Sequence, residues 1–280
     1  MYSQYMFNMI NLNPAYAGNF GGDNITLLYR MQWVGVDGAP KTGTVSWDTR
    51  NVDSNVGYGL QLYNDRLGIE STTGFQGFYS YKLKLSYSTL TFGLSGGALN
   101  YQAAYSKATT TSSNDPLFEQ DINIILPTIG FGILYNANRM YLGFSIPAFL
   151  KTKIDINNTR YSTSANNHYF LTGGYVFDVS EGIKLKPSML IKAAQGSALA
   201  FDVNINAWIQ NTVGLGVSYR ANDALVGMFE IRITPQLTLG YAYDYLISNL
   251  KTFSTGSHEL MMKIEFNQPK NLRIISPRYY

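Results

Sequence analysis

The sequence predicts an all-β protein, a transmembrane antiparallel β-barrel of about 14 strands, and three observations support this fold class. Charged residues make up 14% of the 280 residues, against roughly 25% in an ordinary soluble domain. Tyr, Phe and Gly are abundant, with 22, 15 and 26 copies, and aromatic side chains favour strands. Apolar and polar residues alternate along many segments of about ten residues, which is the length that crosses a bilayer with tilt, whereas globular strands run about 5 to 6 residues.

The first 23 residues carry no clean period and contain several aromatic residues and Pro14. Two interpretations of this segment stay open on composition alone. It could plug or brace the mouth of the barrel, or it could be a poorly ordered leader, as many terminal segments are.

The alternation that follows has period 2, which points successive side chains to opposite faces of a strand. Odd positions from Ile25 to Trp33 are apolar or aromatic while the even ones are mostly polar, and the same contrast recurs from Glu259 to Phe266. Such segments predict strands near residues 24–34, 42–51, 55–66, 72–86, 89–104, 127–136, 139–150, 166–179, 183–194, 198–210, 212–221, 224–234, 236–248 and 257–267. The number is even, as in bacterial outer-membrane barrels.

The length of each connection depends on whether the predicted strand before it is even- or odd-numbered. Tight turns around Asp53, Ser88, Asn138, Glu181, Asn211 and Pro235 follow even-numbered strands, and long loops over 36–41, 66–71, 105–126, 151–165 and 249–256 follow odd ones. The connections at Gln195 and Asn222 are short and break this rule in part. Because outer-membrane barrels have short periplasmic turns and longer outer loops, we expect an N-terminal segment (1–23) and a C-terminal tail (268–280) on the periplasmic side of a single barrel domain (24–267).

A soluble β-sandwich or barrel would also show period 2. However, Gly, Ser, Thr and Asn fill the second face of these segments, where a soluble protein would carry many Lys and Glu. The membrane barrel is therefore the preferred interpretation, and the absence of a secretory signal at Met1–Tyr5 is expected of a mature chain in the cell outer membrane.

Several function classes lose support. The chain has no Cys and only two His, so thiol chemistry and Cys-based metal sites are excluded and a multi-His site is disfavoured. Lys and Arg are spread along the chain and the net charge is only +3, which gives no support to nucleic-acid binding. We expect no enzyme activity, no catalytic or metal residues and no cofactor.

The inner face of the predicted barrel carries charges of both signs, which can pair and close the lumen, whereas a selective pore more often has one sign in a ring. Glycines at 57 and 59, 130 and 132, and 214 and 216 also fall on this face. Fourteen strands leave room for a water-filled lumen unless side chains or a plug fill it. The predicted inward charges are Arg30, Asp48, Lys82, Lys84, Lys184, Lys186, Lys192, Asp202, Arg220, Glu230, Arg232, Asp244, Glu259, Lys263 and Glu265.

The candidate partner-binding residues lie in loops and at strand ends. Asp37, Gly38 and Pro40 supply turn chemistry directly after a strand that ends in aromatic residues. Trp33 would suit a membrane-interface belt, with a partner contact as the sharper alternative. The remaining candidates are His168 at a strand start, and His258 with Glu259, for which a structural role is the simpler explanation.

Short motifs along the whole chain resemble the PorP/SprF family of outer-membrane proteins, associated with type IX secretion and gliding motility in Bacteroidota. One departure is Met9-Ile10, where the family more often has Pro after the Asn. The motifs are Gln4–Asn8, Asn13–Gly18, Tyr29–Arg30, Gln32–Gly35, Asp37–Pro40, His168–Phe170, Leu185–Ser188, Ser218–Arg220, Gly240–Asp244, Gly256–Glu259 and Ser276–Tyr280.

The resemblance implies a non-enzymatic barrel that helps to export and anchor a cell-surface adhesin carrying a type B C-terminal sorting domain. It also implies periplasmic contacts with ring components of the secretion machinery and with a peptidoglycan-binding lipoprotein. A passive pore for small solutes is the alternative, and a hydrolase built on His168 or His258 is the least supported one. A blocked lumen would favour the anchor, and conductance without stable protein partners would favour the pore.

Overall fold

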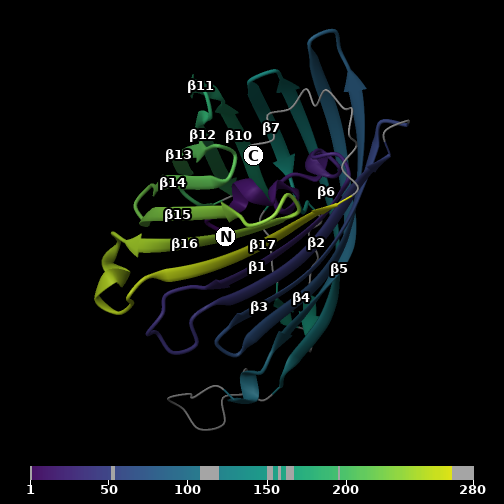
Figure 1. Ribbon diagram of the computed structural model, residues 1–280. Coiled ribbons are helices and arrows are strands. Elements are labelled where there is room, and N and C mark those ends of the chain that lie inside the picture. Colours follow the sequence, from purple (N-terminus) through teal and green to yellow (C-terminus); the bar gives the residue numbers. More distant parts are fainter. Residues whose placement is uncertain are drawn as a thin grey trace.

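A computed structural model shows a closed antiparallel β-barrel around a short N-terminal segment (Figure 1). The structure describes residues 2–51, 54–107, 120–149, 154–156, 159–161, 167–194 and 196–266. The wall is formed by β1 (Asp23–Met31), β2 (Lys41–Asn51), β3 (Val56–Leu67), β4 (Glu70–Lys84), β5 (Ser88–Ala103), β6 (Ile122–Ala137), β7 (Met140–Ile146), β10 (His168–Tyr175), β12 (Ile183–Ala194), β13 (Ala200–Ile209), β14 (Val213–Arg220), β15 (Ala224–Arg232), β16 (Leu237–Leu246) and β17 (Ser257–Phe266).

Each wall strand pairs with its neighbours along the chain, and β1 pairs with β17. The pairing of β10 with β7 on one side and β12 on the other closes the ring. The short β11 (Phe177–Ser180) continues β10, because Gly174 faces Ser188 and Phe177 faces Leu185 in one unbroken register. The described residues therefore form a closed barrel of 14 strands, as predicted.

Most strand ends lie within a few residues of the prediction, and the largest differences occur on either side of one loop. The strand β6 begins at Ile122 instead of 127, and β7 ends at Ile146 instead of 150. Three consecutive apolar residues, Ile124–Leu126, break the alternation and conceal the start of β6 in the sequence. Pro147 follows β7, and a proline has no N–H to continue a ladder. The predicted loop over 151–165 contains a two-stranded hairpin, β8 (Ile154–Ile156) and β9 (Thr159–Tyr161).

The wall has apolar side chains on its outer face and polar side chains on its inner face, which is the reverse of a soluble protein. Leu62, Leu94 and Val217 are exposed on the outer face, while Asn204, Ser218 and other polar residues are buried inside. Such a surface is stable against hydrocarbon and unfavourable in water. Among the described residues, none of the helices is long and apolar enough to cross a membrane.

The two ends of the barrel are named here by their connections. Among the described residues, the loop end carries 32–40, 68–69, 104–107, 120–121, 147–149, 167, 196–199, 221–223 and 247–256, with the short helices η4 (Tyr105–Lys107) and η6 (Asn249–Thr252). The turn end carries the described residues 54–55, 85–87, 138–139, 181–182, 210–212 and 233–236. The connections follow the predicted parity except at one place. The long loop predicted over 66–71 is wrong, because β3 continues to Leu67 and β4 begins at Glu70, and Gly68, with φ of 56°, supplies a tight turn between them.

Candidate functional site

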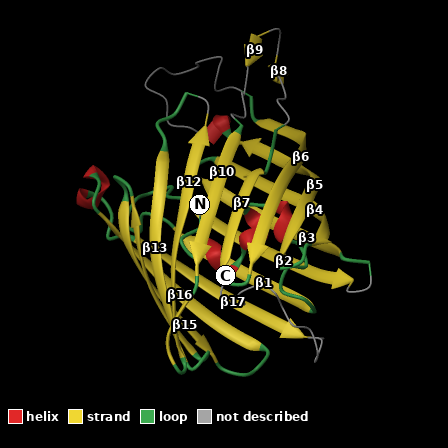
Figure 2. Ribbon diagram, turned by 90° about the horizontal axis from the view of Figure 1, so that it is seen from above, coloured by secondary structure: helices red, strands yellow, loops and turns green. Residues whose placement is uncertain are grey.

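Residues 2–22 form a segment that lies inside the barrel, here called the plug. Figure 2 shows its short helices surrounded by the strands, and they are η1 (Tyr5–Phe7), η2 (Met9–Asn11) and η3 (Pro14–Tyr16). Its side chains are buried almost completely, with 1% exposure at Met6, Met9 and Tyr16. Of the two interpretations of the N-terminus, the plug is confirmed and the poorly ordered leader is wrong.

The described part of the N-terminal segment lies within the barrel, while the periplasmic position of the chain ends stays a prediction. The plug begins among the last residues of β16 and the first of β17, at the loop end, and reaches the turn end where β1 begins at Asp23. Strand parity alone does not reveal this path, because it locates the start of β1 and not the chain before it. The predicted tail, 268–280, lies outside the described residues.

A row of small residues crosses the wall beneath the plug. Successive cross-strand partners on β3 to β7 are Gly57, Ser80, Gly93, Gly132 and Ser145. The serines donate hydrogen bonds to the plug, from Ser145 Oγ to the Leu12 carbonyl at 2.6 Å and from Ser80 Oγ to the Ala17 carbonyl at 2.7 Å. Residues 12–17 therefore lie directly on this row, running across the strands.

The glycines of the row permit this close approach. A Cβ at Gly93 would lie 2.1 Å from the Ala15 nitrogen, and one at Gly132 would lie 2.0 Å from Asn13 Oδ1. Distances of this size exclude any side chain. The inward position that the sequence predicts for Gly57 and Gly132 is thus confirmed, and its reason is close contact with the plug, through the Ala17 carbonyl at Gly57 and the Asn13 side chain at Gly132.

Asn13 fixes the plug at the centre of the row. Its Oδ1 accepts a hydrogen bond from the Ala15 N–H at 2.9 Å, which caps η3, and Pro14 occupies the first helical position. Both features are typical of helix starts. Its Nδ2 donates to the carbonyls of Ile133 and Phe144 on β6 and β7. The motif that begins at Asn13 thus joins local helix formation to attachment to the wall.

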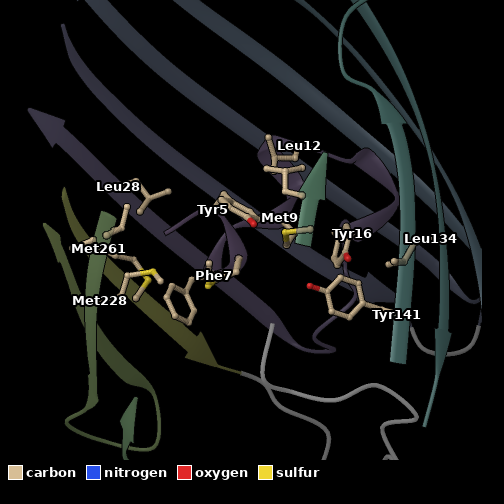
Figure 3. Packing of buried hydrophobic residues seen from close by; sticks show 14 of the residues in the cluster. Tyr5, Phe7, Met9, Leu12, Tyr16, Leu28, Leu134, Tyr141, Met228 and Met261 are labelled. Carbon is tan, nitrogen blue, oxygen red and sulfur yellow. The ribbon is translucent and has the colours of Figure 1, made fainter. Parts of the chain in front are cut away.

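Apolar side chains of the plug fill the middle of the lumen. Figure 3 shows Tyr5, Phe7, Met9 and Leu12 directed into a cluster with wall residues from several strands. Burial raises the pKa of the Tyr5 hydroxyl above its usual value, so this group stays protonated, and it accepts a hydrogen bond from Asn204 Nδ2 at 2.7 Å. The wall partners labelled in the figure are Leu28, Leu134, Tyr141, Met228 and Met261.

A buried ionic cluster holds the plug at the loop end. Arg30 pairs with Asp244 at 2.7 Å and with Glu259 at 3.3 Å, and these three side chains are 0–2% exposed. Arg220 pairs with Asp244 at 3.2 Å and also contacts Asp202. These five residues, called the loop-end ionic cluster, come from β1, β13, β14, β16 and β17.

The plug supplies hydrogen bonds to this cluster. Glu259 accepts from the backbone N–H groups of Ser3 and Gln4, at 2.7 and 2.8 Å. Ser3 Oγ donates to Asp244 and accepts from the guanidinium of Arg30 at 2.9 Å. Buried charges require ion pairs and hydrogen bonds of this kind to be tolerated, so the cluster and the start of the plug depend on one another.

The turn end holds the plug through fewer charges. Asp48 Oδ2 accepts from the Gly18 N–H at 2.9 Å, and Lys82 Nζ donates to Asn19 Oδ1 at 3.2 Å. Lys263 Nζ lies 3.7 Å from the centroid of the Phe20 ring, within cation–π range. These contacts close the barrel where the plug joins β1.

The predicted inward orientation of the charges agrees with the structure. Most of them are buried within the barrel and engage the plug or each other. The described residues contain no group of three or more His, Cys, Asp or Glu positioned for a metal ion. The buried members are Arg30, Asp48, Lys82, Lys186, Asp202, Arg220, Asp244, Glu259 and Lys263.

Four of the predicted partner-binding residues lie in one loop that bridges its neighbours. Trp33 is half-buried with φ of 52°, and its N–H donates to Ser257 Oγ at 3.1 Å. The Gly38 carbonyl accepts from the Gly68 N–H at 2.8 Å. Asp37 is exposed and Pro40 is half-buried. The loop is thus ordered by contacts on both sides and presents Asp37 to the exterior.

The other three predicted residues are dispersed. His168 is exposed at the start of β10, and His258 lies on the outer face, where its Nδ1 is 2.7 Å from Tyr241 Oη. Strands β10 and β17 lie on opposite sides of the ring. Glu259 is fully buried in the loop-end ionic cluster, so its contacts are within the chain.

Sequence reasoning missed Ser3, Asp202, Arg220 and Asp244 as parts of one site. The inward charges were available from strand alternation, but their proximity follows from the ring order of β1, β17, β16 and the strands beyond. No spacing in the sequence signals that Ser3 reaches this point.

Comparison with known proteins gives one family and a fold. A family model described as "Type IX secretion system membrane protein PorP/SprF" matches residues 1–264. No curated protein matches the chain. Among solved structures, the outer membrane protein Omp33 of Acinetobacter baumannii is 11% identical with a TM-score of 0.51, over 88% of this chain and 98% of that one.

A second similar structure is the TodX deltaS2S3 mutant, a monoaromatic hydrocarbon channel. It is 9% identical with a TM-score of 0.51, over 90% of this chain and 91% of that one. At such identities the likeness shows the outer-membrane barrel fold and no shared activity.

Proposed function

The chain belongs to the PorP/SprF family of type IX secretion system membrane proteins, and from this premise we propose that it anchors a secreted protein at the cell surface. In this proposal it is a non-enzymatic barrel that helps to export and then holds an adhesin with a type B C-terminal sorting domain. Family and fold together locate the chain in the outer membrane.

The observation that carries the proposal is the plug. It occupies the lumen from the loop-end ionic cluster to Asp48 at the turn end, and wall residues on the far side, such as Lys186 and Leu190, are fully buried as well. A passive pore for small solutes requires a continuous water path, which a filled lumen opposes. A barrel that works as a fixed anchor has no such requirement.

The two ends would then serve different partners. The loop end offers the ordered loop of Trp33 and Asp37 and the long strands β5 and β6 for an exported protein. The turn end, where Lys84, Arg139 and Lys184 add charge, would face the periplasmic ring components and a peptidoglycan-binding lipoprotein. Charged rims of this kind steer protein association.

Affinity purification of the barrel from its native cells in mild detergent, with conductance measured on the same fractions, tests the proposal. We expect a large surface protein, retained through its C-terminal domain, or a periplasmic lipoprotein, and no channel activity. A lone barrel that conducts ions would contradict the anchor and favour the pore.

A further inference from the structure

The strand β6 extends far beyond its neighbour β7. The pairing of β6 with β7 ends where Phe131 faces Ile146, whereas the pairing of β6 with β5 continues to Ile122. A further bond joins the Phe149 N–H to the Ile129 carbonyl at 3.0 Å. Within the described chain, β6 therefore has an unpaired edge over residues 122–128, about 23 Å long at about 3.3 Å per residue.

The hydrogen-bonding groups of this edge can be assigned from the ladder. Because the Ile129 carbonyl points toward β7 and orientation alternates along an antiparallel strand, the N–H and C=O groups of Asn123 and Ile125 point to the free edge. Pro127 lacks an N–H, which is typical of edge strands. In the described part of the chain, two donors and three acceptors thus remain free for another strand.

The inner face beside this edge is apolar, unlike most of the interior. Cross-strand pairs on β5 and β6 are Ala103 with Ile122, Tyr101 with Ile124, and Leu99 with Leu126. The side chains of Ile122, Ile124 and Leu126 are only half-buried, and Ile125 on the outer face is 74% exposed. A strand added at this edge would continue the apolar row if every second residue were apolar.

The edge lies on the loop end and outside the bilayer-spanning part of the wall. Strand β6 has 16 residues, whereas about 9 to 11 cross a membrane. The described hairpin β8–β9 pairs with itself and not with the barrel sheet. The short β7 lies between β6 and β10, and β10 begins at His168 on the side of β7 away from β6.

We propose that the β6 edge, residues Asn123–Thr128, binds an extended segment of the exported surface protein by β-strand addition. The segment carries apolar residues at alternate positions, which pack beside Ile122, Ile124 and Leu126. This inference rests on the proposed function, since it names the surface through which the anchored protein is held.

Photo-crosslinking in native cells tests the contact. Benzoylphenylalanine replaces Asn123 at the edge, and in the control it replaces Leu94, an exposed residue on the outer face of β5. We expect a crosslink from position 123 to a segment of the surface protein with alternating apolar residues, and none from position 94. A crosslink from position 123 to residues of this chain would overturn the inference, because the edge would then be covered internally.

A matched pair of substitutions tests strand addition itself. Ile125→Pro removes the edge N–H without touching the ladder to β5, and Ile125→Thr keeps both the N–H and the strand preference. We expect Ile125→Pro to lower the retained surface protein about tenfold and Ile125→Thr to leave it near the wild-type amount, with equal amounts of folded barrel. Equal retention by both variants would refute the edge while leaving the anchor intact, whereas absence of any surface protein from the wild-type barrel would refute the anchor.

Discussion

The plug is held at its loop end and at its middle by two different kinds of contact. At the loop end Ser3 and Gln4 join buried charges that come from five strands. In the middle Asn13–Ala17 lies so close to Gly93 and its small neighbours that the wall has no room for larger side chains there. The first attachment depends on charge balance, whereas the second depends on the absence of side chains, so different substitutions should break them.

The largest effect is expected from filling the small-residue row. Gly93→Val places a side chain within 2.1 Å of the Ala15 nitrogen, so the plug backbone must leave the wall. We expect ion conductance in planar bilayers where the wild-type barrel gives none, together with new protease cleavage within the plug.

Gly96→Val is the matched control on the same strand. Gly96 faces outward and an added Cβ meets nothing within 4 Å, so this variant should behave like the wild type. Conductance by both variants would mean that the strand, and not the contact with the plug, is disturbed.

The second largest effect is expected from removing one negative charge from the loop-end ionic cluster. Asp244→Asn leaves Arg30 and Arg220 without a shared carboxylate, and breaking a buried pair of this kind costs about 3 kcal/mol or more. We expect the free energy of unfolding, measured by urea titration in detergent, to fall by about that amount.

Asp178→Asn provides the comparison. Asp178 is 46% exposed and pairs with Arg139 and Lys184, and an exposed pair contributes about 0 to 1 kcal/mol. An equal fall in the free energy of unfolding in the two variants would mean that the loop-end ionic cluster stabilises the barrel no more than an exposed ion pair does.

The turn end provides a smaller test. Asp48→Ala removes the acceptor of the Gly18 N–H and leaves that donor buried, which costs about 1 to 3 kcal/mol. Asp48→Asn keeps an acceptor oxygen and should lose less. If the two variants unfold at the same urea concentration, the contact to Gly18 does not stabilise the plug.

Much of the wall could be predicted from the sequence, because alternation over about ten residues is a local property. It gave the strand number and the inward charges, such as Arg30 and Lys186. The position of the plug and the row of Gly57, Gly93 and Gly132 could not be predicted, because they depend on which residues face each other across strands. The start of β6 was missed for a different reason, since Ile124–Leu126 is apolar on both faces.

The smallest effect is expected from Ser3. It measures how much the hydrogen bonds from the plug stabilise the loop-end ionic cluster, apart from the ion pairs themselves. Ser3→Ala removes the hydroxyl that donates to Asp244 and accepts from both guanidiniums, while the backbone N–H of Ser3 still reaches Glu259. Arg30 and Asp244 remain paired at 2.7 Å, so we expect a loss near 1 kcal/mol, the contribution of a typical hydrogen bond. Because the cluster is buried, this loss should not change between low and high salt. A loss as large as that of Asp244→Asn in the same urea titration would mean that Ser3 holds the charges in place, and the plug would then organise the cluster instead of being fastened by it.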